Sequence, residues 1–121
     1  MAEHNTLGIL GEEKALEYMM AKGYRLKARN WYYKKKEIDI IAEDDRFLII
    51  VEVKTRSSLF ESEAQSTVTI KKQKYLVEAA AHYIEENNIQ KETRFDIITV
   101  ITGNGPISIE HIEDAFYPTL K

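Results

Sequence analysis

The sequence predicts an α/β fold, a single domain over residues 1–121 with a central mixed β-sheet flanked by helices. Two segments, 6–22 and 69–87, repeat apolar residues at the spacing of an amphipathic helix. A nearly continuous apolar run, 47–53, is rich in β-branched residues and is typical of a central strand covered on both faces. The length of 121 residues suits one compact domain and is short for two.

Helices and strands are expected to alternate along the chain. The expected elements are a helix at 6–22, strands at 24–30, 37–42 and 47–53, a loop at 57–66, a helix at 69–87, strands at 94–101 and 107–109, and a helical tail over the last dozen residues. Helices that separate strands of one sheet pack on its faces, so this order favours a mixed sheet with helices on it.

The first predicted helix contains an acid on its apolar side. The helix is expected to begin at a cap, Asn5 or Thr6, and to stop at Gly23. Glu12 falls inside its apolar arc, and an ionised carboxylate there is costly unless it is paired, hydrogen-bonded or close to a metal. Two interpretations stay open for Glu12: a salt bridge at the edge of the core, or a role in a functional site.

Charge is distributed unevenly along the chain. The formal net charge of −3, taken alone, argues against a nucleic-acid partner. Seven basic residues and no acid fall within 22–36, so the rest of the chain carries −10. The same segment holds Tyr24, Trp31, Tyr32 and Tyr33; basic side chains neutralise phosphates and aromatic faces stack on bases. The segment is therefore either a nucleic-acid contact or a solvated stretch whose aromatic rings enter the core.

Composition excludes several classes of protein. The chain has no cysteine, which rules out disulfides and cysteine-based zinc sites. Its three histidines show no metal-ligand spacing. The first ten residues do not resemble a signal peptide, and no run approaches the ~20 apolar residues that span a bilayer. We therefore expect a cytoplasmic protein with no membrane partner.

Two acids and a lysine are predicted to converge where two strands meet. If a two-residue turn at 44–45 joins these strands, Asp39 lies opposite Ile50. Because side chains alternate, Glu52 and Lys54 then share the face of Asp39, although a one-residue change in the loop would break this arrangement. Two carboxylates suit Mg²⁺ or Mn²⁺, and a nearby lysine orients or deprotonates an attacking water. The alternative is a set of ordinary charges at strand ends.

A series of short motifs covers nearly the whole chain. They are GILGEEKA at 8–15, GY at 23–24, RNW at 29–31, EIDIIA at 37–42, VEVKTR at 51–56, KQ at 72–73 and RFD at 94–96. With these motifs in this order, the chain resembles the YraN-type family of small bacterial proteins, which is related to the PD-(D/E)xK nucleases and to archaeal Holliday-junction resolvases. The resemblance implies a restriction-endonuclease-like core.

The resemblance also implies roles for particular residues. Asp39 and Glu52 take the places of metal ligands for Mg²⁺ or Mn²⁺, Lys54 that of the nuclease lysine, and Glu12 that of a glutamate on the first helix. Arg94 and Asp96 of the RFD motif are expected to form a structural pair that supports the sheet. The residues expected to contact nucleic acid are Arg29, Lys34, Lys35, Lys36, Arg56, Lys72 and Gln73, with Lys36 standing where the family usually has glycine.

The function expected from the residues and the resemblance is that of a metal-dependent endonuclease-like protein acting on DNA, with branched DNA or repair intermediates as substrates. Two alternatives stay open: a non-catalytic nucleic-acid-binding module on a nuclease scaffold, and a protein-interaction domain. A homodimer is expected only by analogy with junction-cutting relatives.

Overall fold

The computed structural model describes residues 2–57, 68–103 and 105–117. The elements in chain order are α1 (Ala2–Ala21), β1 (Arg25–Tyr33), β2 (Lys36–Glu43), β3 (Phe47–Arg56), α3 (Ile70–Glu86), β4 (Glu92–Ile101) and β5 (Ser108–Phe116). Apart from Ser57, the loop predicted at 57–66 lies outside the described residues. No helix in the described part of the chain is long and apolar enough to span a membrane.

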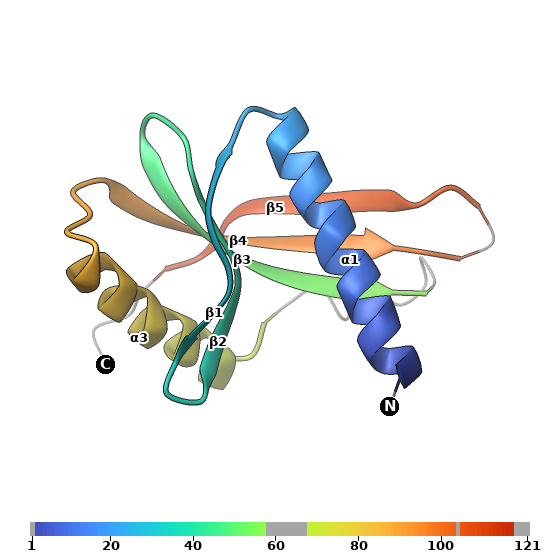
Figure 1. Ribbon diagram of the computed structural model, residues 1–121, viewed down its shortest axis with the longest axis horizontal. Helices are drawn as coiled ribbons and strands as arrows, with labels where there is room; N and C mark the ends of the chain where they lie inside the picture. Colours follow the sequence, from blue (N-terminus) through green and yellow to red (C-terminus); the bar gives the residue numbers. More distant parts are fainter. Residues whose placement is uncertain (1, 58–67, 104, 118–121) are drawn as a thin grey trace.

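The strands form one five-stranded sheet in the order β1-β2-β3-β4-β5 (Figure 1). The pair β3–β4 is parallel and the other three pairs are antiparallel, so the sheet is mixed, as predicted. A parallel pair needs a crossover connection, and α3 lies within it. A mixed sheet with two helices confirms the α/β fold class and is consistent with a restriction-endonuclease-like core.

The central strand β3 is buried on both faces, which confirms the interpretation of its apolar run. Leu48 and Ile50 belong to a core cluster that includes Leu76 of α3. Ile49 and Val51, on the alternate face, belong to a cluster that includes Ala15 and Met19 of α1. The two helices therefore cover opposite faces of the sheet, and each face buries its own apolar layer.

The helix predicted at 69–87 is confirmed as α3, and its two capping residues are the two ends of the predicted range. Thr69 accepts a hydrogen bond from the Lys72 backbone N–H at 3.1 Å, and Asn87 is the C-cap.

The first strand is longer than predicted. β1 continues to Tyr33 instead of ending at Asn30, because the β1–β2 hairpin packs on α3: Trp31 meets Tyr83 edge-on, and Tyr33 stacks on His82.

Both ends of the described chain differ from prediction. α1 begins at Ala2, before the predicted caps Asn5 and Thr6, and alanine and glutamate at positions 2 and 3 are strong helix formers. The predicted helical tail is wrong for residues 110–116, which continue β5. β5 pairs with β4 from Ser108 to Ile112 and, after a bulge, again at Phe116, and satisfying the backbone groups along that edge of β4 outweighs the weak local pattern.

Candidate active site

Asp39 lies where β2 and β3 stop pairing. The β2–β3 ladder ends at the pair Ile40 and Val51; beyond it β2 stays beside β1 and β3 stays beside β4, and the strands diverge in Figure 1. At this fork the Val53 backbone N–H donates to Asp39 Oδ2 at 2.8 Å. The Asp39 side chain thus takes the place of a strand partner for β3 and is positioned by its backbone.

The predicted register of the β2–β3 hairpin is wrong by two residues, but this error does not change which side chains share a face of the sheet. Asp44 accepts the backbone N–H groups of Arg46 and Phe47 on Oδ1, at 2.8 and 2.7 Å, so the turn residues are 45 and 46. Moving a two-residue turn by one position changes every partner by two. Ile50 therefore pairs with Ile41, and the ladder ends just before Asp39 and Glu52, whose carboxylates lie close enough to shift each other's pKa.

Asp39 and Glu52 form a largely buried acidic pair. Burial and the neighbouring Glu52 charge raise the pKa of Asp39 to about 8, against the lowering effect of the Val53 N–H. Burial also raises the pKa of Glu52, although Lys72, Lys54 and a hydrogen bond with Asp39 oppose the rise. Glu52 Oε1 is buried with no hydrogen-bond partner. Such a pair favours either a shared proton or an added cation.

Two lysines adjoin this acidic pair. Lys54 follows Glu52 on the same face of β3 and is half-buried. Burial and the charge of Arg56 lower the pKa of Lys54, and the nearby carboxylates only partly offset them. Lys72, in the first turn of α3, places its Nζ 3.9 Å from Glu52 Oε2. The structure therefore brings Asp39, Glu52, Lys54 and Lys72 together from three elements.

Gly11 sets how closely α1 approaches this site. A Cβ on Gly11 would overlap the hydroxyl of Thr55, so only glycine allows α1 to pack this near to the end of β3. The next residue, Glu12, is half-buried beside the sheet, and its charge contributes to the raised pKa of Asp39. A glycine in the middle of a predicted helix was the available sequence signal for this close approach.

Asn30 joins Glu12 to a further acid, Glu37. Asn30 adopts a φ of +48°, a conformation that asparagine tolerates better than most residues. Its Nδ2 donates to Glu12 Oε1 and to Glu37 Oε2, both at 3.0 Å. The amide thereby holds two carboxylates beside the acidic pair. Neither Asn30 nor Glu37 was among the predicted site residues, and the polar asparagine within a strand was the available signal.

The residues predicted to contact nucleic acid divide into three groups. Lys72 and Arg56 adjoin the acidic pair, as their effects on Glu52 and Lys54 show. Lys34 and Lys35 are exposed in the turn of the β1–β2 hairpin. The other residues are engaged within the fold.

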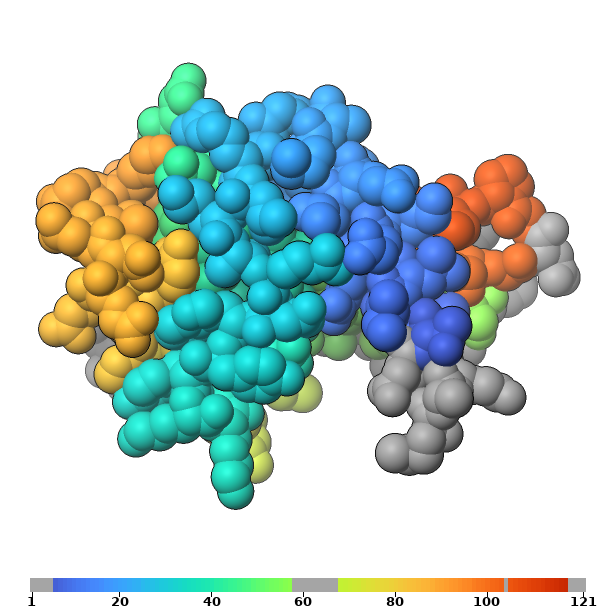
Figure 2. Space-filling model, viewed as in Figure 1, coloured from blue at the N-terminus to red at the C-terminus, as the bar shows by residue number. Residues whose placement is uncertain are grey.

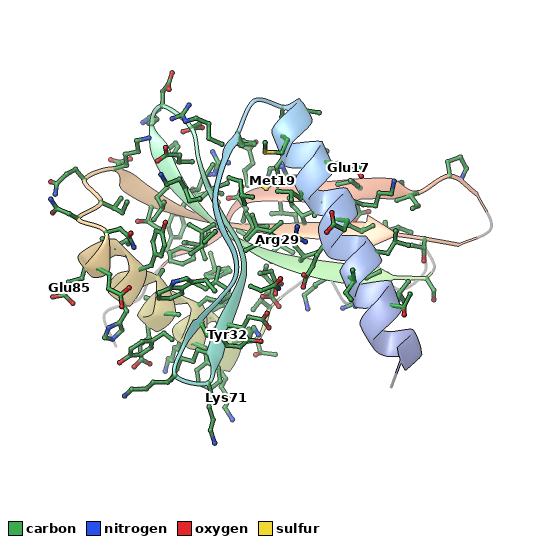
Figure 3. The ribbon with its side chains drawn as sticks, viewed as in Figure 1. Glu17, Met19, Arg29, Tyr32, Lys71 and Glu85 are labelled. Atoms are coloured by element: carbon green, nitrogen blue, oxygen red, sulfur yellow. The ribbon has the colours of Figure 1, made fainter. Side chains whose placement is uncertain are left out.

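Those engagements join the hairpin and α3 to their neighbours. Arg29, labelled in Figure 3, donates to Glu13 of α1 at 2.7 Å. Lys36 lies 3.6 Å from Glu78 of α3. Gln73 donates to the Val68 carbonyl at 2.8 Å. Much of the predicted basic segment is thus neutralised locally, since Arg25 and Lys27 also pair with Glu43.

The acidic pair fits a divalent cation only with water as the remaining ligands. Among the described residues, no group of three or more His, Asp or Glu side chains is arranged to hold a metal ion. Mg²⁺ commonly binds through one or two carboxylates and keeps several waters, so two carboxylates satisfy this requirement. The unpartnered Glu52 Oε1 and the raised pKa of Asp39 are what such a cation would relieve.

The RFD motif forms a second buried network, on β4 and β5. Arg94 donates to both oxygens of Asp96, at 2.9 Å from Nε and 2.8 Å from Nη2. His111 Nε2 lies 2.7 Å from Asp96 Oδ2, and the Asp114 backbone N–H donates to Oδ1 at 3.0 Å. The predicted Arg94–Asp96 pair is therefore present. Tyr18 extends the network to α1, with its hydroxyl 3.0 Å from His111 Nδ1.

Comparison with known proteins identifies relatives over the full length. Residues 11–100 match the model of the family described as "Uncharacterised protein family UPF0102". A UPF0102 protein of Phocaeicola vulgatus is 43% identical over 120 residues, covering 99% of both chains. A UPF0102 protein of Flavobacterium psychrophilum is 47% identical over 117 residues, covering 97% of this chain and 98% of the relative.

Proposed function

The chain belongs to the UPF0102 family, which comprises the YraN-type proteins, and from its site we propose that it is a metal-dependent nuclease that hydrolyses phosphodiester bonds in DNA. One observation carries the proposal: Asp39 and Glu52 are buried together with their negative charge incompletely compensated, and Lys54 adjoins them. Burying two acids together lowers the stability of the folded protein, so a functional role is the simplest reason for the pair.

Each residue has a definite part in this proposal. Asp39 and Glu52 would hold Mg²⁺ or Mn²⁺, and the bound ion would neutralise phosphate charge and acidify a water. Lys54, whose pKa is lowered by burial and by Arg56, accepts a hydrogen bond or a proton from that water more readily than an ordinary lysine. Glu12 is held by Asn30 beside the pair and adds negative potential.

The basic residues around the pair support a nucleic-acid substrate. Lys72 and Arg56 adjoin it, and the exposed Lys34 and Lys35 extend the positive surface along the hairpin. Lys and Arg at these places would bind phosphates of the backbone on either side of the reacting bond. DNA, including branched DNA and repair intermediates, is the proposed substrate.

The test is cleavage of labelled single-stranded, duplex, gapped and four-way-junction DNA with Mg²⁺ or Mn²⁺. We expect Asp39→Asn and Lys54→Met to lower cleavage at least 100-fold, in the range typical for removing a catalytic acid–base group. Asp45→Asn is the matched control, because Asp45 lies in the turn of the β2–β3 hairpin that also carries Asp39 and its side chain is fully exposed. Wild-type cleavage by both site variants would refute the proposal.

A non-catalytic DNA-binding module is the second candidate. It is favoured by Lys72, whose ammonium already lies 3.9 Å from Glu52 and partly replaces a metal. This candidate predicts binding that falls steeply with salt, is the same in EDTA and in Mg²⁺, and is never followed by cleavage.

A further inference from the structure

The three consecutive aromatic residues of β1 have different surroundings. Trp31 and Tyr33 are half-buried and pack against α3, through Tyr83 and His82. Tyr32 points to the other side of the hairpin, as alternation along a strand requires, and 61% of it is exposed. Figure 3 shows it toward the tip of the hairpin. The aromatic rings on the α3 side therefore serve the fold, whereas the ring of Tyr32 is available to a ligand.

Tyr32 stands beside the acidic residues of the site. Its partner across the hairpin is Glu37, the acid that Asn30 holds together with Glu12. The charge of Glu37 and a hydrogen bond to it, with smaller effects of Glu12 and Asp39, raise the pKa of the Tyr32 phenol. Tyr32 thus lies next to the carboxylates of the site while most of its side chain stays exposed.

Exposed cations continue from this ring along the hairpin. Lys34 and Lys35 occupy the turn directly after β1 and are exposed. In the space-filling view the hairpin and α1 are in contact over their middle and diverge toward the tip of the hairpin and the N-terminal end of α1 (Figure 2). A strand whose phosphate reached the acidic pair would continue past Tyr32 toward these lysines.

An aromatic ring stacks only on a base whose face is free. In a continuous duplex each base is covered by its neighbours, whereas single strands, gaps, flaps and junctions offer uncovered bases. We infer that Tyr32 is a base-stacking residue, and that the site selects strands with an unpaired nucleotide next to the phosphate held at Asp39 and Glu52. This inference rests on the proposed nuclease function and names the substrate class of the same site.

The direct test is binding of 2-aminopurine-labelled DNA by the full-length protein in Ca²⁺, followed by fluorescence. The probes are a single-stranded 12-mer, the matched duplex and the duplex with a one-nucleotide gap. We expect wild type and Tyr32→Phe to quench the unpaired 2-aminopurine and to bind these probes alike. Tyr32→Ala should lose the quenching and bind the single-stranded and gapped probes roughly 5- to 150-fold more weakly, the usual effect of removing one stacked ring.

Matched variants separate stacking from a structural role. Tyr117→Ala is the control, because Tyr117 is also exposed and its hydroxyl also bonds a carboxylate, that of Asp114, beyond the far edge strand of the sheet. It should bind as wild type does. Tyr32→Leu keeps an apolar side chain without an aromatic face and should behave like Tyr32→Ala. Equal quenching by wild type and Tyr32→Ala, or an equal loss on duplex and single strands, would overturn the inference.

Cleavage assays in Mn²⁺ distinguish this inference from the function on which it rests. Tyr32-dependent quenching without any cleavage would refute the nuclease proposal and support the stacking residue. Cleavage whose preference for unpaired substrates is unchanged in Tyr32→Ala would refute the stacking residue and leave the nuclease in place.

Discussion

Asp39 and Asp96 are both largely buried aspartates on strands of one sheet, and the fold treats their charges in opposite ways. Asp96 is fully buried and accepts hydrogen bonds from Arg94, His111 and the Asp114 backbone. Burial alone would raise the pKa of Asp96, but those bonds outweigh it and lower the pKa. Its negative charge is compensated inside the protein.

Asp39 receives one backbone N–H, from Val53, and its neighbours Glu52, Glu12 and Glu37 are acids. Burial and Glu52 raise its pKa to about 8. The difference shows how a structural acid is distinguished from a candidate functional one. The negative charge of the structural acid is neutralised by a cationic side chain of the same protein, whereas the charge of the functional acid is neutralised by a proton or a ligand.

The largest expected effect comes from breaking the compensated network. Asp96→Asn removes the charge that faces Arg94, whose side chain is only 10% exposed, and leaves a buried guanidinium without its main partner. We expect a loss of about 3–5 kcal/mol in the free energy of unfolding, measured with urea. Adding Arg94→Met should recover part of that loss. A loss below about 1 kcal/mol would show that Asp96 is not the structural acid.

Asp39→Asn should act in the opposite direction. The amide oxygen keeps the bond from the Val53 N–H, while the charge repelled by Glu52 disappears. We expect the unfolding free energy at pH 8, measured without metal, to be higher than that of wild type by more than about 1.4 kcal/mol, the equivalent of one pKa unit. A clear destabilisation would mean that the Asp39 charge supports the fold and that the contrast with Asp96 fails.

The two aspartates should also give opposite pH dependences. Between pH about 4 and 8 the folded protein keeps a proton on Asp39 that the unfolded chain loses, so this group lowers stability as pH rises. Asp96 has a lowered pKa, so its contribution is present above pH about 4 and is lost as pH falls through the folded value.

Urea unfolding of wild type and Asp39→Asn in EDTA, from pH 4 to 9, isolates the first of these effects. The difference in stability between the two proteins should grow with pH, at up to about 1.4 kcal/mol per pH unit for one group, and level off near pH 8. A difference that stays constant with pH would show that Asp39 titrates normally.

A smaller effect is expected at Asn30, which holds acids on the Asp39 side of the comparison. Asn30→Ala removes the donor shared by Glu12 and Glu37, and these contacts are exposed. We expect a stability change of at most about 1 kcal/mol, with a clear decrease in cleavage because Glu12 is no longer held. Unchanged cleavage would place Glu12 outside the site.

The sequence was sufficient for the features that depend on local pattern. The apolar run that forms β3 and the helical stripe over 69–87 follow from spacing alone, and the shared face of Asp39, Glu52 and Lys54 follows from strand alternation once a two-residue turn is assumed. The turn was predicted one position too early, but the side chains still share the predicted face because a register change of two residues preserves the alternation of side chains along a strand.

What the sequence could not supply depends on contacts between distant segments. The basic segment at 22–36 was predicted to be available to nucleic acid because its acidic partners, such as Glu13 and Glu78, lie far from it in the sequence. The strand over residues 110–116 exists because β4 pairs with it. Gly11 and Asn30 stand out in the sequence as a glycine within a helix and an asparagine within a strand, but the contacts that make them important depend on how closely α1 approaches β3 and β1.

Calorimetric titration with Mn²⁺ at pH 8 tests most directly whether Asp39 and Glu52 bind a divalent cation, as we propose. Wild type and the exposed-acid control Asp45→Asn should bind one ion per chain, while Asp39→Asn should bind at least tenfold more weakly. Mn²⁺ binding of the same strength in wild type and Asp39→Asn, or no binding by wild type, would contradict the account.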